Sequence, residues 1–120
     1  MASTIEVSCV QEVPRAERIA RLNDTLRKTG AGGRIMITRG VRALSDFNPV
    51  ELTGALAAYD QFDALNDPHG ERDFGGIDLW GAELLFKIDY YAPGLLLGSD
   101  DPADPAVTQR VLTVLLAEEY

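Results

Sequence analysis

The chain has 120 residues, of which 46% are hydrophobic and 25% are charged, so it has the size and apolar content of one globular domain rather than two. The net charge of −8 is divided unevenly: residues 1–59 carry eight Lys or Arg against six Asp or Glu, whereas residues 60–120 carry three against 13, giving +2 and −10. An acidic second half repels nucleic acids and membrane surfaces and can attract basic protein grooves, so we expect no direct binding to nucleic acid or membrane.

The sequence also predicts a cytoplasmic protein. No apolar run approaches the roughly 18 residues that a membrane-spanning helix needs. Residues 1–14 contain Glu6 and Glu12 but no Lys or Arg, so we expect no signal peptide. The single Cys9 cannot form an internal disulfide, which agrees with a reducing compartment, and we interpret it as a small buried thiol.

The chain begins with a candidate strand followed by a helix. Residues 1–13 are a candidate extended or strand-forming segment, because apolar residues alternate at Ile5, Val7 and Cys9. A helix is predicted from about Pro14 to Lys28, closed by Gly30 as a left-handed cap. Its apolar residues recur at the helical spacings i, i+3 and i+7: Ile19, Leu22 and Leu26.

A strand and a second helix come next. The short, β-branched run Arg34–Arg39 is bounded by glycines, which favours a buried strand. Asn48 then reads as an N-cap, Pro49 as a first-turn residue and Glu51 as a capping-box glutamate. These signals predict a helix that ends near Leu65.

A β-hairpin is predicted over residues 73–91. Gly81-Ala82 is a Gly-X pair of the kind that closes a two-residue type II′ turn. This turn would set Leu79 opposite Leu84, Ile77 opposite Phe86 and Gly75 opposite Ile88, all on one buried face. The other face would carry a mixed set of side chains: Asp78, Trp80, Glu83, Leu85, Lys87 and Asp89. Gly75-Gly76 would mark a bulge or a close backbone approach.

The chain closes with a predicted helix. Asp104 would cap it and Pro105 would open it, and its apolar side would be lined by Val107, Val111, Val114 and Leu115. Glu118 and Glu119 would then lie at the unfavourable end of the helix dipole. The predicted fold class is therefore α+β: one domain over residues 1–120, in which a small antiparallel sheet of one strand plus a hairpin packs against about three helices.

The densest polar segment is Asn66–Asp73, but it predicts no metal, cofactor or catalytic residue. Its alternating side chains could aim at one cation: Asp67, His69, Glu71 and Asp73. The spacing fails the EF-hand pattern, which needs glycine where Arg72 stands and glutamate where Asp78 stands. A solvated turn is the simpler interpretation. His69 as a general base held by Glu71 or Asp73 is a weaker alternative, because a histidine beside proline and glycine is typical of an exposed turn.

Two other catalytic patterns are absent from the sequence. The glycine-rich run Thr29–Arg34 follows a helix and precedes a strand, which reverses the context of a phosphate-binding loop. No serine lies in a nucleophile-elbow pattern. The sequence therefore predicts a protein that is not an enzyme.

The acidic second half is the remaining candidate. Residues 60–104 contain 11 acidic and two basic residues, a net of −9. A solvated, solubilising surface would account for this charge; the sharper alternative is mimicry of the phosphate array of DNA. The residues predicted to bind a partner are Asp67, Glu71, Asp73, Asp78, Glu83, Asp89, Asp100 and Asp101.

Short blocks in order along the chain resemble a known family. They are Arg18–Asp24, Thr29–Gly30, Gly32–Arg34, Thr38–Val41, Asn66–Pro68, Asp73–Gly75, Lys87–Tyr91, Asp101–Pro105, Arg110–Thr113 and Ala117–Tyr120. From about Arg15 to Tyr120 the chain resembles the bacterial family catalogued as domain of unknown function 3768. The resemblance brings no activity, but it implies a small protein of alphaproteobacterial chromosomes, plasmids and prophages, and so a mobile-element accessory role. The resemblance implies that many family members have the sequence acidic-His-Asp-Phe-Gly at Glu71–Gly75. This chain has Arg72 in place of the histidine, and that difference argues against a metal or catalytic role for the segment.

Three functions are consistent with the sequence. The favoured one is a non-enzymatic inhibitor of a nucleic-acid-handling defence complex, such as a restriction or CRISPR effector, that offers carboxylates to its basic groove. The second is a small metal- or ligand-dependent enzyme that uses the segment Asp67–Asp73. The third is a protein-interaction module without mimicry. The sequence does not define the oligomeric state.

Overall fold

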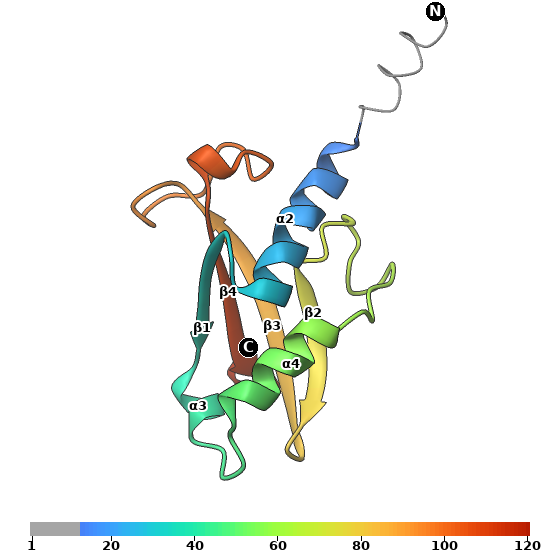
Figure 1. Ribbon diagram of the computed structural model, residues 1–120, viewed down its shortest axis with the longest axis vertical. Coiled ribbons are helices and arrows are strands. Elements are labelled where there is room, and N and C mark those ends of the chain that lie inside the picture. Colours follow the sequence, from blue (N-terminus) through green and yellow to red (C-terminus); the bar gives the residue numbers. More distant parts are fainter. Residues whose placement is uncertain (1–12) are drawn as a thin grey trace, which may run out of the picture.

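The computed structural model describes residues 13–120 and contains helices on one side of a four-stranded sheet (Figure 1). In chain order the elements are α2 (Arg15–Thr29), β1 (Gly33–Ile37), α3 (Arg39–Arg42), α4 (Pro49–Ala58), β2 (Phe74–Leu79), β3 (Ala82–Tyr91), the 3₁₀ turn η1 (Pro105–Val107), β4 (Gln109–Leu116) and the 3₁₀ turn η2 (Ala117–Glu119). The predicted strand at Ile5, Val7 and Cys9 lies outside the described residues.

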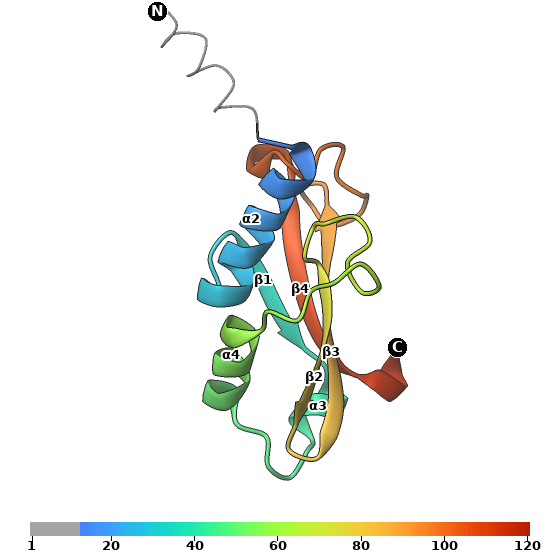
Figure 2. The same ribbon diagram turned by 90° about the vertical axis from the view of Figure 1, so that its right-hand side faces the viewer.

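The predicted α+β class is confirmed. The strand order is β1-β4-β3-β2, and the sheet is mixed because β1 pairs with β4 in parallel whereas β4, β3 and β2 pair antiparallel. Helices α2 and α4 lie on the same face of the sheet (Figure 2). Within residues 13–120, the opposite face carries no long helix.

Both long helices begin where the sequence predicts them. Helix α2 ends at Gly30, whose φ of 79° confirms the left-handed cap. The Asn48 side chain accepts hydrogen bonds from the backbone N–H groups of Val50 and Glu51, as an N-cap should. Helix α4 stops at Ala58 rather than near Leu65, because Tyr59 is extended and buries its ring. Glu51 does not close a capping box; it accepts a hydrogen bond from Trp80.

The hairpin is confirmed but its predicted turn is wrong. Trp80 and Gly81 form the two-residue turn with φ values of 57° and 74°, which match a type I′ turn, so Leu79 pairs with Ala82 and Ile77 with Leu84. The pairing differs from the prediction by two residues, an even number, so every strand residue keeps its predicted face. Only Trp80 is misassigned: its ring packs edge-on against Phe47, 5.7 Å away, beside α4.

The predicted C-terminal helix is wrong. Asp104 does cap and Pro105 does open a helical turn, but η1 ends at Val107 and the chain continues as strand β4, between β1 and β3. A central strand with apolar side chains on both faces has a continuous apolar sequence. A buried helix can have the same sequence pattern, so periodicity does not distinguish the two. Glu118 and Glu119 therefore meet no helix dipole; the Glu119 carboxylate accepts from the Leu116 N–H and the Thr38 hydroxyl.

Strand β1 is confirmed as a strand but not as a buried one. It is an edge strand with Ile35 36% and Met36 53% exposed. The short β-branched run predicted burial, but β1 has a neighbouring strand, β4, on one side only in the part of the chain that the structure describes.

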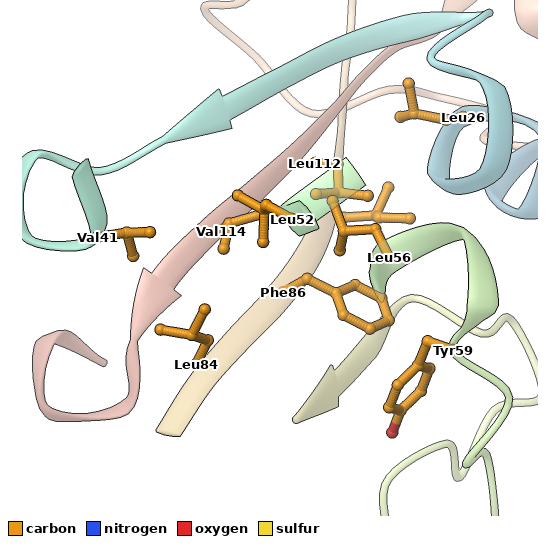
Figure 3. Close-up of a cluster of buried hydrophobic side chains, with 10 residues drawn as sticks. Leu26, Val41, Leu52, Leu56, Tyr59, Leu84, Phe86, Leu112 and Val114 are labelled. Atoms are coloured by element: carbon orange, nitrogen blue, oxygen red, sulfur yellow. The ribbon is translucent and has the colours of Figure 1, made fainter. Parts of the chain in front are cut away.

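The core lies between the helices and the inner face of the sheet (Figure 3). Its buried side chains are Leu26, Val41, Leu52, Leu56, Tyr59, Leu84, Phe86, Ile88, Leu112 and Val114. The Tyr59 and Phe86 rings meet edge-on with centroids 5.2 Å apart. A Cβ on Gly75 would come within 2.6 Å of both rings, so this glycine provides the space for their contact.

Candidate functional site

The face of the sheet opposite α2 and α4 is the outer face, and it is only partly covered. Successive side chains of a strand point to opposite faces, so the outer face carries the residues that alternate with the core: Arg34, Met36, Phe74, Asp78, Glu83, Leu85, Lys87, Asp89, Tyr91, Val111, Thr113 and Leu115. The C-terminal turn covers one part, where the Tyr120 ring lies 5.9 Å from that of Phe74. The rest of the outer face is accessible to a partner.

Two carboxylates lie directly opposite one another at the hairpin. Asp78 of β2 is paired in register with Glu83 of β3, and both side chains are exposed. Residues that flank a two-residue turn form a hydrogen-bonded pair, so Asp78 and Glu83 form the next, non-hydrogen-bonded pair, with Cα atoms about 4.5 Å apart. Like charges directly opposite destabilise a sheet. No ion pair to either residue is present in residues 13–120.

Two further exposed carboxylates lie at the same end of the molecule. Glu51, in the first turn of α4, accepts a hydrogen bond of 3.1 Å from the indole N–H of Trp80, which places it beside the hairpin turn. Asp46 precedes Phe47, whose ring contacts Trp80. We refer to Asp46, Glu51, Asp78 and Glu83 as the acidic hairpin end.

Asp89, predicted to bind a partner, lies on the outer face but is already paired. The Lys87 ammonium, two residues before it on the same face, lies 2.7 Å from its carboxylate. The hydrogen bond to Asp89 raises the pKa of Lys87. Asp89 therefore adds little net negative charge to the outer face.

The predicted carboxylates Asp67, Glu71 and Asp73 lie together in the loop before β2 but serve the fold. Asp67 accepts a hydrogen bond from the Arg72 N–H, and Glu71 accepts one of 2.9 Å from the Tyr90 hydroxyl. Burial, followed by the charges of Glu71 and Asp67, raises the pKa of Asp73.

Arg72 joins this loop to α2. It has a positive φ of 52°, and its guanidinium donates to both carboxylate oxygens of Asp24, the shortest contact being 2.7 Å, and to Glu17 at 3.2 and 3.3 Å. The hydrogen bond from Arg72 lowers the pKa of Glu17. Burial alone would raise the pKa of Asp24, but hydrogen bonds from Arg72 and Arg27 outweigh it and lower that pKa. Arg72 thus carries a structural ion-pair network.

Asp100 and Asp101 lie at the end of the molecule away from the hairpin turn. Asp101 accepts a backbone hydrogen bond from Ala103, which is the main cause of its lowered pKa, and it forms an ion pair of 3.0 Å with Arg15. Asp100 is exposed. The eight predicted residues therefore occupy several separate places, and only Asp78 and Glu83 form a close exposed pair.

The segment Asp67–Asp73 was also the candidate for metal or acid–base chemistry. Among residues 13–120, no three His, Cys, Asp or Glu side chains are grouped closely enough to hold an ion. His69 is exposed.

A buried polar cluster that the sequence analysis missed lies between α2 and the sheet. Asn23 and Arg110 are at most 1% exposed. Arg110 donates to the Asn23 side-chain oxygen at 2.9 Å and to the Pro102 carbonyl, and Asn23 donates to the Tyr90 hydroxyl at 2.7 Å. Burial lowers the pKa of Arg110 and raises that of Tyr90. The signal in the sequence was one arginine at an inward position of an apolar strand, which a helical interpretation of residues 105–116 concealed.

Comparisons with known proteins identify a family but no described activity. A family model described as "Protein of unknown function (DUF3768)" matches residues 37–119. No curated protein and no solved structure matches the chain. No helix in the described part of the chain is long and apolar enough to cross a membrane.

Proposed function

We propose that this chain, which belongs to the family described as Protein of unknown function (DUF3768), is a non-enzymatic, cytoplasmic binding protein that docks its acidic hairpin end onto a basic protein groove. The observation that carries the proposal is the exposed Asp78–Glu83 pair on the outer face. The register places two like charges together at a cost in stability, and a cationic partner would offset that repulsion on binding.

The geometry supports a smaller docking surface than the sequence suggested. Of the acidic residues outside the hairpin end, Asp89 and Asp101 have cations of this chain beside them. Such residues contribute less to a long-range negative field. Docking centred on Asp78 and Glu83 requires no array that extends over residues 60–104.

The favoured partner is the nucleic-acid groove of a protein complex. Grooves that bind DNA present Lys and Arg to phosphates, and closely spaced carboxylates on a rigid hairpin carry the same sign of charge. Together with the implied mobile-element role of the family, this supports inhibition of a host restriction or CRISPR complex.

The test is capture from a bacterial host lysate with two matched baits. The wild-type protein should retain a nucleic-acid-binding complex that duplex DNA releases. Asp78→Asn/Glu83→Gln should lose it, whereas the control Asp60→Asn/Asp100→Asn, which removes the same charge from exposed sites elsewhere, should retain it. Equal retention by both variants, or a complex that duplex DNA does not displace, would contradict the proposal.

A further inference from the structure

The free edge of β1 presents backbone groups that no described residue pairs. The Thr38 N–H donates to the Val114 carbonyl at 3.0 Å, so in the parallel β1–β4 ladder the even-numbered residues direct their backbone toward β4. The N–H and C=O groups of Gly33, Ile35 and Ile37 therefore point away from the sheet. Within residues 13–120, no loop or helix bonds to them. β1 contains no proline, its register with β4 has no bulge, and its one charged residue is Arg34.

An apolar hollow adjoins the same edge on the outer face. It has a volume of about 250 Å³ and is lined by Arg34, Met36, Tyr91, Leu95 and Val111. Four of these side chains come from the adjacent strands β1, β4 and β3, and Leu95 comes from the loop after β3. The hollow could receive an apolar side chain from a strand added at β1.

The loop that supplies Leu95 is ordered by its own hydrogen bonds. Ala92 donates to Leu97 at 2.7 Å, and Leu95 donates to Ala92 at 3.0 Å. Leu95 has a positive φ of 65°, a strained conformation for a non-glycine residue that often occurs at binding sites. The loop leaves Leu96 90% and Leu97 74% exposed. An ordered loop that exposes two leucines is typical of a protein contact.

The charge around β1 is opposite to that of the whole chain. In a protein of net charge −8, four exposed cations lie within β1 or close to its ends and form no ion pair within residues 13–120: Lys28, Arg34, Arg39 and Arg42. The carboxylate of Glu119 also lies near the end of β1, where it accepts hydrogen bonds from Thr38 and Leu116, so the local charge remains positive. A second copy would bring its own β1 arginines against these cations, because two-fold antiparallel pairing at Ile35 sets Arg34 of each copy near the other. An anionic strand fits this edge better.

We propose that the β1 edge binds an extended acidic segment of a partner protein by strand addition. The main chain of the segment would pair with Gly33, Ile35 and Ile37. On the outer face, an apolar side chain of the segment would enter the hollow beside Met36, and a carboxylate two residues away, on the same face, would lie near Arg34. Further carboxylates of the segment would lie toward Arg39, which follows β1. This surface is separate from the acidic hairpin end, because β1 and β2 lie at opposite edges of the sheet.

The probe is a seven-residue peptide whose odd positions alternate valine and glutamate and whose even positions are threonine, so that valine and glutamate share one face of the added strand. Its counterpart has lysine in place of glutamate. Amide hydrogen exchange measured by NMR should show that the acidic peptide protects the Ile35 and Ile37 N–H groups. The lysine peptide should bind at least about tenfold more weakly, because its lysines meet the cations around β1.

Two proline variants separate edge binding from folding. Ile35→Pro removes an outward N–H and leaves the β1–β4 bonds in place, so it should abolish peptide binding while the protein remains folded, and it should cost less stability than Met36→Pro. Met36→Pro removes an N–H that faces β4 and should lower stability instead. The double substitution Arg34→Glu/Arg39→Glu provides a second test without proline and should reverse the preference between the two peptides.

Three results would overturn the proposal. One is equal binding of the two peptides to the wild-type protein. Another is protection of amides elsewhere but not of Ile35 and Ile37. The third is found without peptide: protection of these amides that rises with protein concentration, together with the mass of a dimer in light scattering. That result would assign the edge to a second copy of this chain.

Discussion

Arg72 shows how one side chain can fix a loop that looks in the sequence like a chemical site. Its guanidinium donates to Asp24 and Glu17 across the gap between the loop before β2 and helix α2. Asp24 and Arg27 form a further contact of 2.9 Å, and Arg27 in turn donates to the carbonyls of Leu56 and Tyr59 at the end of α4. The network therefore connects α2, α4 and the loop.

Arg72→Gln should lower the free energy of unfolding by about 1–3 kcal/mol at pH 7, the value of hydrogen bonds to charged groups. Arg72 lowers the folded-state pKa of Glu17 and contributes to lowering that of Asp24. A lowered folded pKa gives stability that is present above the unfolded pKa, near 4, and is lost as pH falls through the folded pKa. Urea denaturation should therefore give a large wild-type–variant difference at pH 7 and little at pH 2.

The control for this prediction is Arg21→Gln, because Arg21 is exposed on α2 and its one ion pair within residues 13–120 is with Glu17. Its effect should be small at both pH values. The prediction would be contradicted if the difference in unfolding free energy between wild type and Arg72→Gln were the same at pH 7 and pH 2. Arg72 would then act through packing rather than through the two carboxylates.

At the scale of elements, the sequence predicted capped and alternating segments best. The Gly30 cap of α2, the Asn48 cap of α4 and the two faces of the hairpin all follow from local chemistry. The position of the hairpin turn does not follow from local chemistry, because Trp80 adopts a positive φ that a tryptophan seldom takes. The contacts of its ring with Phe47 and of its N–H with Glu51 are tertiary and offset that strain.

The final strand shows the limit of periodicity. Val111, Val114 and Leu115 fit a helical stripe, yet they lie on two faces of β4: Val114 points to the core and the other two to the outer face. Only the neighbouring strands decide between these structures, and one of them, β1, lies more than 70 residues away in the sequence. Sequence reasoning about single segments does not include such a pairing.

Gly75 and Gly76 provide a matched test of the core. Gly75→Ala should lower the free energy of unfolding by about 1–3 kcal/mol, because its Cβ would meet the Tyr59 and Phe86 rings at 2.5 and 2.6 Å. Gly76→Ala should be neutral or slightly stabilising, because its nearest contact would be 3.7 Å away. The measurement is the urea midpoint of each variant, and equal midpoints would contradict the packing described for β2.

At the scale of the whole molecule, the charge is divided across the sheet rather than only along the chain. The hairpin edge exposes Asp78 and Glu83, whereas the β1 edge exposes Arg34 and is followed by Arg39. The sequence predicted the outward position of Asp78, Glu83 and Asp89 from alternation alone. It could not predict that Asp101 pairs with Arg15, 86 residues away, since that contact depends on the fold.

Neutralising the hairpin pair should stabilise the fold slightly. Asp78→Asn/Glu83→Gln removes a like-charge pair, so the melting temperature at low salt should rise, by an amount equivalent to no more than about 1 kcal/mol. The rise should shrink in 0.5 M salt, because salt screens exposed charges. Thermal unfolding at two salt concentrations measures both effects; a fall in melting temperature at low salt would mean that the pair stabilises the sheet.

The most direct test of hairpin docking is the salt dependence of association with the captured partner, measured by stopped flow for the wild-type protein and for Asp78→Asn/Glu83→Gln. If the acidic hairpin end attracts a basic groove, the wild-type association rate should fall steeply between low and physiological salt, where the Debye length is about 8 Å. The double variant should associate slowly with a shallower salt dependence, while Asp60→Asn/Asp100→Asn should stay close to wild type. Identical rates and identical salt dependence for wild type and the Asp78→Asn/Glu83→Gln variant would contradict docking through this surface.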